Sequence, residues 1–590
     1  MTTKKQIYSF FRPELRDASY ATGDVYTPDK VLEAQKEWDI LSTSKEKKYP
    51  YLAHVKSLSV TWPHLRLLAD FMEVSTTPTR WGHLRTEGKD SEAAKVAEEA
   101  RNERASRTTV TRLDYSKSGD VTPTECKTPE QLISALKDVS ESKDEHELRL
   151  FVVEDLSRDV IEALGSSLDI EPAFFREHIA DYAWYNIRDR WQDPPNLHVV
   201  SKKQRWLQLR WVTARYFNTS DSFERGVKEA ENFNCVRRPD DDVNNKAVWD
   251  DKNAIVGITR TRASFWLRHA DANRGAVGVL LLDPTIKEGQ PLWYGYRNWE
   301  ETPGVGTTEY PPGPPRDSLY NDFIFWAKKT KPPQYAKSHS SKKQTLPAHV
   351  PVETLLHLIC AEWLTIADYI RTRIGQIEWE VSIPDHFLNK GIGIDEALKK
   401  LHVWRRLVPL YREMLSDTLQ RVFHFPCHAH EIHGSNSCSC ASHHNSSTTN
   451  TSASAPALGP PAPSKNLNRQ LISYSDDFTR VLSYMEEYQS RIDRLTSVVT
   501  AIISIDDSRR GQDDNRNVAR LTWLATFFIP LSYMASLFSM QSDVSLLVGT
   551  YKLYFETALP LAVVSLGLAW VLTMPWFHGW VAGALKKIRG

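Results

Sequence analysis

The sequence is poor in cysteine and has no excess of charge of either sign. Six cysteines in 590 residues are too few for a disulfide scaffold and indicate a reducing compartment. The 74 Lys and Arg residues balance 74 Asp and Glu residues, so the formal net charge at pH 7 is +0. Nucleic-acid-binding proteins usually carry a basic surface, and this balance argues against that class.

The sequence also lacks the short motifs of common enzyme sites. It has no phosphate-binding glycine loop, no HExxH metal motif and no nucleophile elbow. Glu154 and Asp155 resemble a catalytic acid pair, but their place after a predicted strand favours a solvated strand end. We therefore expect a protein that is not an enzyme and that has no resident cofactor.

The mean hydropathy of −0.45 is that of a soluble protein, but the apolar residues are concentrated near the C-terminus. Residues 521–542 and 557–585 contain no charged side chain. A helix crosses the hydrocarbon core with about 20 apolar residues, and a core helix of that length would show a polar stripe. The sequence therefore predicts transmembrane helices at 521–541 and 557–577, joined by an outer loop at 542–556.

The flanking charges predict the orientation of these two spans. Arg516 and Arg520 precede the first span, and a basic tail at 578–590 follows the second. The positive-inside rule then places both termini in the cytoplasm. The first residues show neither a secretory signal nor a mitochondrial presequence, so we expect an integral protein of the plasma membrane.

The rest of the chain predicts a cytoplasmic domain of the α/β or α+β class. Strand-like runs at 148–156, 205–217, 254–267 and 275–284, together with helical segments, predict an α/β part at 146–349, followed by a helical part at 350–425. Residues 1–145 form an N-terminal region without an assigned role, which we expect to be partly disordered. Residues 426–466, rich first in Cys and His and then in Ser and Pro, predict a disordered linker.

The segment 467–520 predicts a long stalk helix that continues into the first span. Its apolar residues follow a heptad pattern, and the a and d positions of a packed or supercoiled helix need a partner surface. That surface is either the helix at 396–424, packed antiparallel, or other copies of the chain, and both arrangements can hold together. The a and d positions are Leu471, Phe478, Met485, Ile492 and Val499, and Tyr474, Val481, Tyr488, Leu495 and Ile502.

Thiol and imidazole side chains are concentrated beside the linker, and such groups suit Zn²⁺. Their spacing matches no closed structural zinc pattern. Adventitious metal binding and a zinc-sensing loop both remain open. The residues are Cys427, His428, His430, His433, Cys438, Cys440, His443 and His444.

Two stretches of the sequence resemble the CorA-type divalent-cation transporters, in particular the large CorA-like proteins of fungi. DDNRNVARLTWLATFFIPLSYMASLFSMQ is similar to the family's first span and its Gly-Met-Asn signature, and RLFVVEDLSRDVIEALGSSLDIEPAFFREHI is similar to a strand-helix-helix unit of its cytoplasmic domain. The resemblance implies a homopentameric funnel in the lipid bilayer, with Mg²⁺ as the expected transported cation.

The resemblance also implies which residues line the pore. Ser539, Met540 and Gln541 stand where the family has Gly-Met-Asn, so the signature is degenerate. A ring of carboxamides still suits the water shell of Mg²⁺, which dehydrates reluctantly. The alternative is a non-conducting, membrane-anchored scaffold or signalling protein. The expected pore positions below the signature are Ser536, Ser532, Ile529, Leu521 and Val518.

Overall fold

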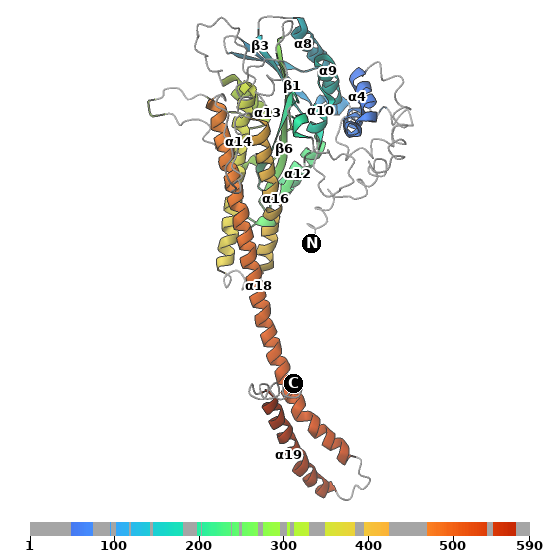
Figure 1. Ribbon diagram of the computed structural model, residues 1–590, viewed down its shortest axis with the longest axis vertical. Coiled ribbons are helices and arrows are strands. Elements are labelled where there is room, and N and C mark those ends of the chain that lie inside the picture. Colours follow the sequence, from blue (N-terminus) through green and yellow to red (C-terminus); the bar gives the residue numbers. More distant parts are fainter. Residues whose placement is uncertain are drawn as a thin grey trace, which may run out of the picture. The chain divides into compact units, whose positions relative to one another are not determined.

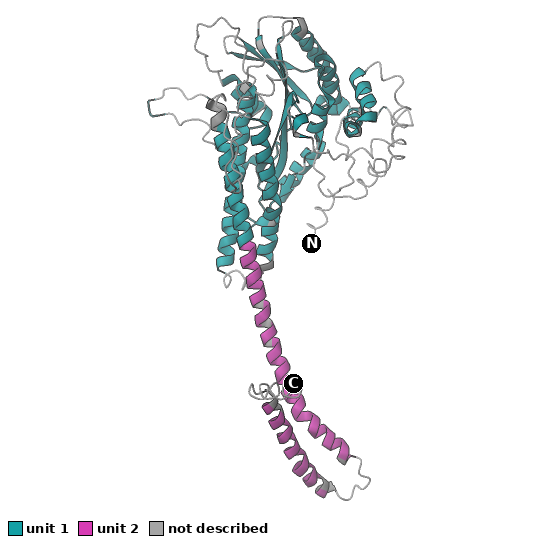
Figure 2. Cartoon of the chain, viewed as in Figure 1, with its two compact units in different colours: residues 1–387, 395–494 teal, residues 388–394, 495–590 magenta. Residues whose placement is uncertain are grey.

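The computed structural model divides into two compact units (Figure 2). Residues 1–387 and 395–494 belong to the first unit, and residues 388–394 and 495–590 belong to the second. The boundary falls inside helix α18, Arg469–Phe538. The structure describes residues 49–74, 95, 99, 102–116, 120–141, 146–180, 197–201, 203–235, 237, 239–246, 250–269, 275–295, 304–306, 312–329, 349–383, 394–423, 469–539 and 547–573.

An eight-stranded sheet forms the centre of the first unit (Figure 1). Its order is β2-β1-β3-β7-β6-β4-β8, with β5 paired to β6. Neighbouring strands are antiparallel except β3 and β7, which are parallel. The strands are β1 Thr109–Ser116, β2 Val121–Cys126, β3 His146–Glu154, β4 Trp206–Phe217, β5 Pro239–Asp241, β6 Ile255–Arg268, β7 Ala276–Leu282 and β8 Gln290–Pro291.

The parallel pair β3 and β7 lies in the middle of the sheet and is buried on both faces. Residues 150–153 of β3 and residues 279–282 of β7 are at most 1% exposed. Strands covered on both faces have continuous apolar runs instead of alternation, and LRLFVVE and AVGVLLL have that pattern. The strands predicted from these runs, and those at β4 and β6, are confirmed.

The sheet begins earlier in the chain than the predicted start of the α/β part at residue 146. Strands β1 and β2 lie within the N-terminal region 1–145, which had no predicted role, and β1 pairs with β3 along its length. The middle of β2 is exposed, so this strand lacks the apolar run by which the other strands are recognised. Helices α4 and α5 also come from this region.

One face of the sheet carries a core made with five helices (Figure 1). Glu162 of α9 fixes α4, because its two carboxylate oxygens accept the backbone N–H groups of Tyr51 and Leu52 at 2.7 and 3.0 Å. These N–H groups lie in the first turn of α4, where the helix itself offers no acceptor. The helices are α4 Pro50–Thr61, α5 Arg66–Val74, α8 Pro129–Glu141, α9 Arg158–Leu168 and α10 Pro172–Ile179.

Longer helices lie against the opposite face of the sheet (Figure 1). Val110 of β1 belongs to the core just described, whereas the next residue, Thr111, bonds the Tyr320 hydroxyl of α13 at 2.5 Å. Successive side chains of a strand point to opposite faces, so α13 lies on the second face. The remaining helices of this unit are α11 His198–Ser201, α12 Ser220–Asn232, α13 Leu319–Lys329, α14 His349–Ser382 and α16 Ile394–Arg421.

The N-terminal part of α18 packs its heptad seam against α16. The Phe423 and Phe478 ring centroids are 5.9 Å apart, and Arg412 Nη1 donates to Gln489 Oε1 at 2.5 Å. Residue numbers rise along α18 as they fall along α16, so the two helices are antiparallel. The predicted intramolecular packing on the 396–424 helix is confirmed. The buried seam residues within the first unit are Phe478, Val481, Met485, Tyr488 and Ile492.

The second unit contains the C-terminal part of α18 and helix α19, Leu547–Thr573. Helix α18 is continuous from residue 469 to residue 538, so the stalk segment and residues 521–538 form one helix. Helix α19 begins ten residues before the predicted second span at 557, and the latter part of the predicted outer loop is therefore helical.

Gly165 of α9 provides a direct test of the packing between α4 and α9. A Cβ at this position would lie 2.6 Å from the Tyr51 ring, which cannot withdraw because its hydroxyl donates to Ile170 O at 2.7 Å. We expect Gly165→Ala to lower the free energy of unfolding by about 1–3 kcal/mol, measured by urea titration.

Gly375 of α14 is the matched control, because a Cβ there meets nothing within 4 Å. Alanine has the higher helix propensity, so Gly375→Ala should raise stability by up to about 1 kcal/mol. Equal effects of the two substitutions would contradict the packing described for Tyr51.

Candidate functional site

The C-terminal part of α18 has the length and composition of a membrane span. Among the described residues, one helix passes that test, Tyr474–Leu537, and its apolar window, of mean hydropathy 1.2, is not buried against the rest of the chain. No charged side chain occurs between Leu521 and Leu537. An uncovered apolar surface of this length requires lipid or another protein surface.

The expected pore positions that the structure describes are all exposed on this helix. Val518, Leu521 and Ile529 are each more than half exposed, and Ser532, Ser536 and Ser539 are exposed as well. Met540 and Gln541 of the degenerate signature lie outside the described residues. In the single chain these side chains are therefore accessible to another protein surface, to lipid or to water.

Helix α19 packs against a different side of α18. The Tyr554 hydroxyl donates to Leu531 O at 3.1 Å, and the Ser565 hydroxyl donates to Thr526 O at 3.3 Å. Both acceptors are backbone carbonyls inside the apolar segment, so the two helices approach closely.

The two sides of α18 are separated around the helix axis. At about 100° per residue, the expected pore positions fall within an arc of about 80°. The partly buried positions lie roughly opposite that arc. They are Thr526, Pro530, Leu531 and Met534. The expected pore positions therefore share one face, which we call the open face, and α19 contacts the other.

Ala525 also belongs to the open face, and reasoning from the sequence missed it. It is exposed and lies four residues from both Leu521 and Ile529, so it falls on the same side of the helix. The resemblance to the family named no position among the seven residues between those two. The spacing of four was the signal that would have found it.

The Cys/His tract at 427–444 lies outside the described residues, so its predicted metal binding is still a prediction. Within the described ranges, no group of three or more His, Cys, Asp or Glu side chains is arranged to hold a metal ion.

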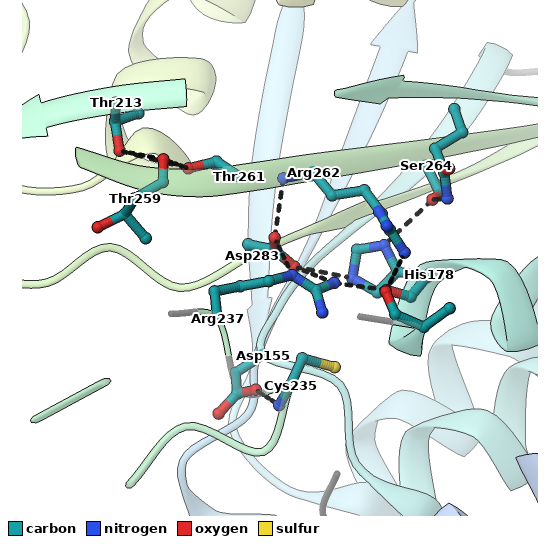
Figure 3. Close-up of polar contacts among 12 residues, drawn as sticks. Asp155, His178, Thr213, Cys235, Arg237, Thr259, Thr261, Arg262, Ser264 and Asp283 are labelled. Carbon is teal, nitrogen blue, oxygen red and sulfur yellow. Dashed lines mark hydrogen bonds and ion pairs between the residues drawn. The ribbon is translucent and has the colours of Figure 1, made fainter. Parts of the chain in front are cut away.

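The first unit has a buried polar cluster where the parallel strands end (Figure 3). Asp283 follows β7 and accepts two hydrogen bonds from Arg237, at 2.8 and 3.1 Å, and one from the Arg262 backbone N–H at 2.8 Å. The Arg262 guanidinium donates to three backbone carbonyls at the C-terminal end of α10. These carbonyls have no partner within their own helix, so the cluster fixes α10 to the sheet.

His178 of α10 lies within this cluster and is completely buried. Its Nδ1 lies 3.1 Å from the Ser264 hydroxyl, and its Nε2 lies 3.5 Å from Asp283. Burial, with Arg237 and Arg262 adding to it, holds the pKa of His178 well below its usual value. A neutral, fully enclosed imidazole is suited to holding the fold together.

Asp155 is also buried, so the expectation of a solvated strand end is wrong for this residue. It is 3% exposed and has a left-handed φ of 55°. Its carboxylate accepts the backbone N–H groups of Asn234 and Cys235 at 2.9 and 3.1 Å (Figure 3). Burial outweighs these two hydrogen bonds and raises the pKa of Asp155 to about 7.

The comparisons with known proteins give a weak structural likeness. No family model and no curated protein matches the chain. Among solved structures, the chain is similar to the CorA magnesium transporter from Methanocaldococcus jannaschii, with a TM-score of 0.33 and 9% identity. The match covers 78% of this chain and 96% of that one.

The raised pKa of Asp155 predicts how stability changes with pH. A carboxyl whose folded pKa of about 7 exceeds its ordinary value of about 4 stabilises the fold fully below pH 4 and loses that contribution as pH rises through 7. Neutral, buried His178 acts in the opposite direction below its ordinary pKa of about 6.5. The effect of Asp155 on stability is therefore measured above about pH 6.5, where His178 contributes little.

From about pH 6.5 to 8.5 the first unit should lose on the order of 1 kcal/mol of stability through Asp155. Asp155→Asn should reduce this loss, and Asp251→Asn, at an exposed position, should leave it unchanged. Thermal unfolding followed by tryptophan fluorescence measures the effect. An unchanged pH profile for Asp155→Asn would contradict the assignment.

The packing of α19 on α18 depends on small residues, and Ala562 tests it. Ala558 and Ala562 are at most 1% exposed, and small residues allow helix backbones to approach closely in membranes. Ala562→Phe should therefore lower the thermal stability of the purified protein in detergent. Val563→Phe, at a neighbouring position that is 60% exposed, is the control, and equal losses for both would refute the packing.

Proposed function

We propose that the chain is a CorA-like membrane transporter or channel for divalent metal cations, with Mg²⁺ as its principal substrate. Residues 521–541 of several copies would surround the pore, and a homopentamer is the proposed assembly. The proposal includes no catalytic role and no resident cofactor. The metal ion is cargo.

The division of α18 into two faces is the observation that carries this proposal. The chain's own second helix covers one face, and the open face of Val518, Leu521, Ala525, Ile529, Ser532 and Ser536 has no cover within the described chain. If identical helices surround an axis, the face turned from α19 is the one that lines it. Ser532 and Ser536 would offer hydroxyl groups to hydrated ions, while Ile529 and Leu521 would form apolar constrictions.

The proposed outer mouth is the Ser539-Met540-Gln541 sequence. Five Gln541 carboxamides would hydrogen-bond the water shell of an entering ion, which suits Mg²⁺ because it keeps its waters. Gln has the same functional group as Asn with one more methylene, so the ring would be narrower than an Asn ring.

The proposed topology has a second span at 557–577 and both termini in the cytoplasm. Residues 557–573 of α19 contain no charged side chain, and Arg516 and Arg520 flank the first span on the inner side. The plasma membrane is the proposed location.

The second candidate function is a membrane-anchored scaffold or signalling protein that does not conduct ions. The departure from Gly-Met-Asn at 539–541 favours it. Ser539 adds a side chain where glycine lets the backbone take conformations closed to other residues.

Uptake of Mg²⁺ into liposomes distinguishes the two functions. The full-length protein should admit Mg²⁺ into vesicles that contain a Mg²⁺-sensitive dye when the interior is negative. Gln541→Ala should change the uptake rate, and Ala525→Phe should lower it at least about tenfold, because it places a large ring on the open face.

Ala519→Phe is the matched control, since Ala519 is also exposed but lies about 120° around the helix from Ala525. It should leave uptake close to that of the unaltered protein. Size-exclusion chromatography checks that each variant assembles. If the unaltered protein admits no divalent cation, the scaffold function is favoured. If Ala525→Phe and Ala519→Phe lower uptake equally, the open face does not line the pore.

A further inference from the structure

A cavity of about 430 Å³ lies between the edge of the sheet and α13 in the first unit. It is lined by residues from β1, β2, the end of β3, the segment after β7 and the first turn of α13. Pockets for small molecules have volumes of about 300–1,000 Å³. This cavity is therefore large enough for a small metabolite. None of the residues proposed to line the pore belongs to its lining.

The cavity contains two opposite charges that do not form an ion pair. Glu154 at the end of β3 and Lys287 after β7 both line it, and the Lys287 charge acts on the Glu154 carboxyl. Among the described residues, no ion pair links the two, although Lys and Glu side chains are long enough to meet across a short gap. The space between them is open to a ligand with complementary charges.

Glu154 is poorly compensated for its burial. Burial raises its pKa to about 7, and Lys287 and one hydrogen bond from the Thr285 backbone offset this only in part, while Asp155 and Asp317 add to it. A bound ammonium group beside the carboxylate would supply the missing charge. Glu125 of β2, which is separated from β3 by β1 in the same sheet, adds a second carboxylate to the lining.

The remaining lining groups suit a small molecule with both polar and apolar parts. The Tyr320 hydroxyl is already engaged with Thr111 at 2.5 Å, which fixes the wall between β1 and α13. Asn321 Nδ2 already donates to Asp317 at 2.8 Å, so Lys287 supplies the hydrogen-bond donors, and Pro123 and Ile324 supply apolar surface.

We propose that this cavity binds a free α-amino acid, with its ammonium group at Glu154 and its carboxylate at Lys287. A bare metal cation would meet the Lys287 ammonium at close range, and a simple anion would meet the Glu154 and Glu125 carboxylates. A zwitterion satisfies both charges at once and leaves its side chain for Pro123 and Ile324. The proposal goes beyond cation transport and does not depend on whether the protein conducts.

Thermal unfolding of the full-length protein in detergent tests the proposal. Each of the standard L-amino acids is added separately at about 10 mM, since a ligand that binds the folded state raises the unfolding midpoint. At least one amino acid should raise it. Ethylamine offers only an ammonium group, sodium acetate only a carboxylate and MgCl₂ only a metal cation, so none of them should raise the midpoint.

Variants then locate the binding site by calorimetry with the amino acid that gives the largest shift. Glu154→Gln and Lys287→Met should each raise the Kd at least about tenfold. Glu396→Gln on α16 and Lys328→Met near the end of α13 remove the same charges from exposed positions that do not line the cavity and should leave the Kd unchanged. Lys287 is itself exposed, so its replacement leaves the fold intact even where Glu154→Gln does not.

Three results would overturn the proposal. The first is a panel in which no amino acid shifts the midpoint. The second is a shift that survives in both Glu154→Gln and Lys287→Met, which places binding elsewhere. The third is an equal shift with MgCl₂ alone that is lost in Glu154→Gln, which makes the cavity a cation site.

Discussion

Helix α18 meets two different environments along one unbroken run of residues. Its N-terminal part buries Phe478, Met485 and Ile492 within the first unit, whereas Leu521 and Ile529, further along the same helix, are each about two-thirds exposed. The backbone hydrogen bonds are made inside the helix in both parts, except at Pro530, which has no N–H to donate to Thr526 O; that carbonyl accepts from Ser565 of α19. The change of environment along α18 is therefore determined mainly by its side chains. The rest of the first unit covers the N-terminal part of the helix, whereas the face with Leu521 and Ile529 stays uncovered.

The first unit supplies that protein surface because its sheet holds both helical layers in place. The parallel strands β3 and β7 end at a buried cluster in which Asp283 is compensated by Arg237 and by the Arg262 backbone. A buried charge without such partners would cost several kcal/mol. The same cluster caps α10 on one face of the sheet, and Tyr320 of α13 bonds to β1 on the opposite face. Both helical layers are therefore anchored to the same sheet.

The sequence predicts the parts of this fold that carry a strong apolar period. Strands β3, β4, β6 and β7 and the heptads of α18 were all recognisable, because burial on one or both faces fixes their residue pattern. Strand β2 was not, since its middle is exposed. The burial of Asp155 was not either, because its partners Asn234 and Cys235 lie some 80 positions away. Ala525 could have been found from the spacing of four, whereas the direction of the open face required the contacts of α19.

The composition of the open face favours the proposed shared axis over lipid as its cover. A serine in a helix can satisfy its hydroxyl on the carbonyl of the preceding turn, so Ser532 and Ser536 alone do not exclude lipid. Their arrangement with Ala525 is more informative, because these small residues occupy one stripe while large side chains such as Phe528 and Leu524 flank it. Lipid chains adapt to side chains of any size, whereas space near an axis shared by several helices is limited. Small and hydroxylic residues on that stripe, interrupted by Leu521 and Ile529, agree with the proposed passage, in which wide and narrow levels alternate.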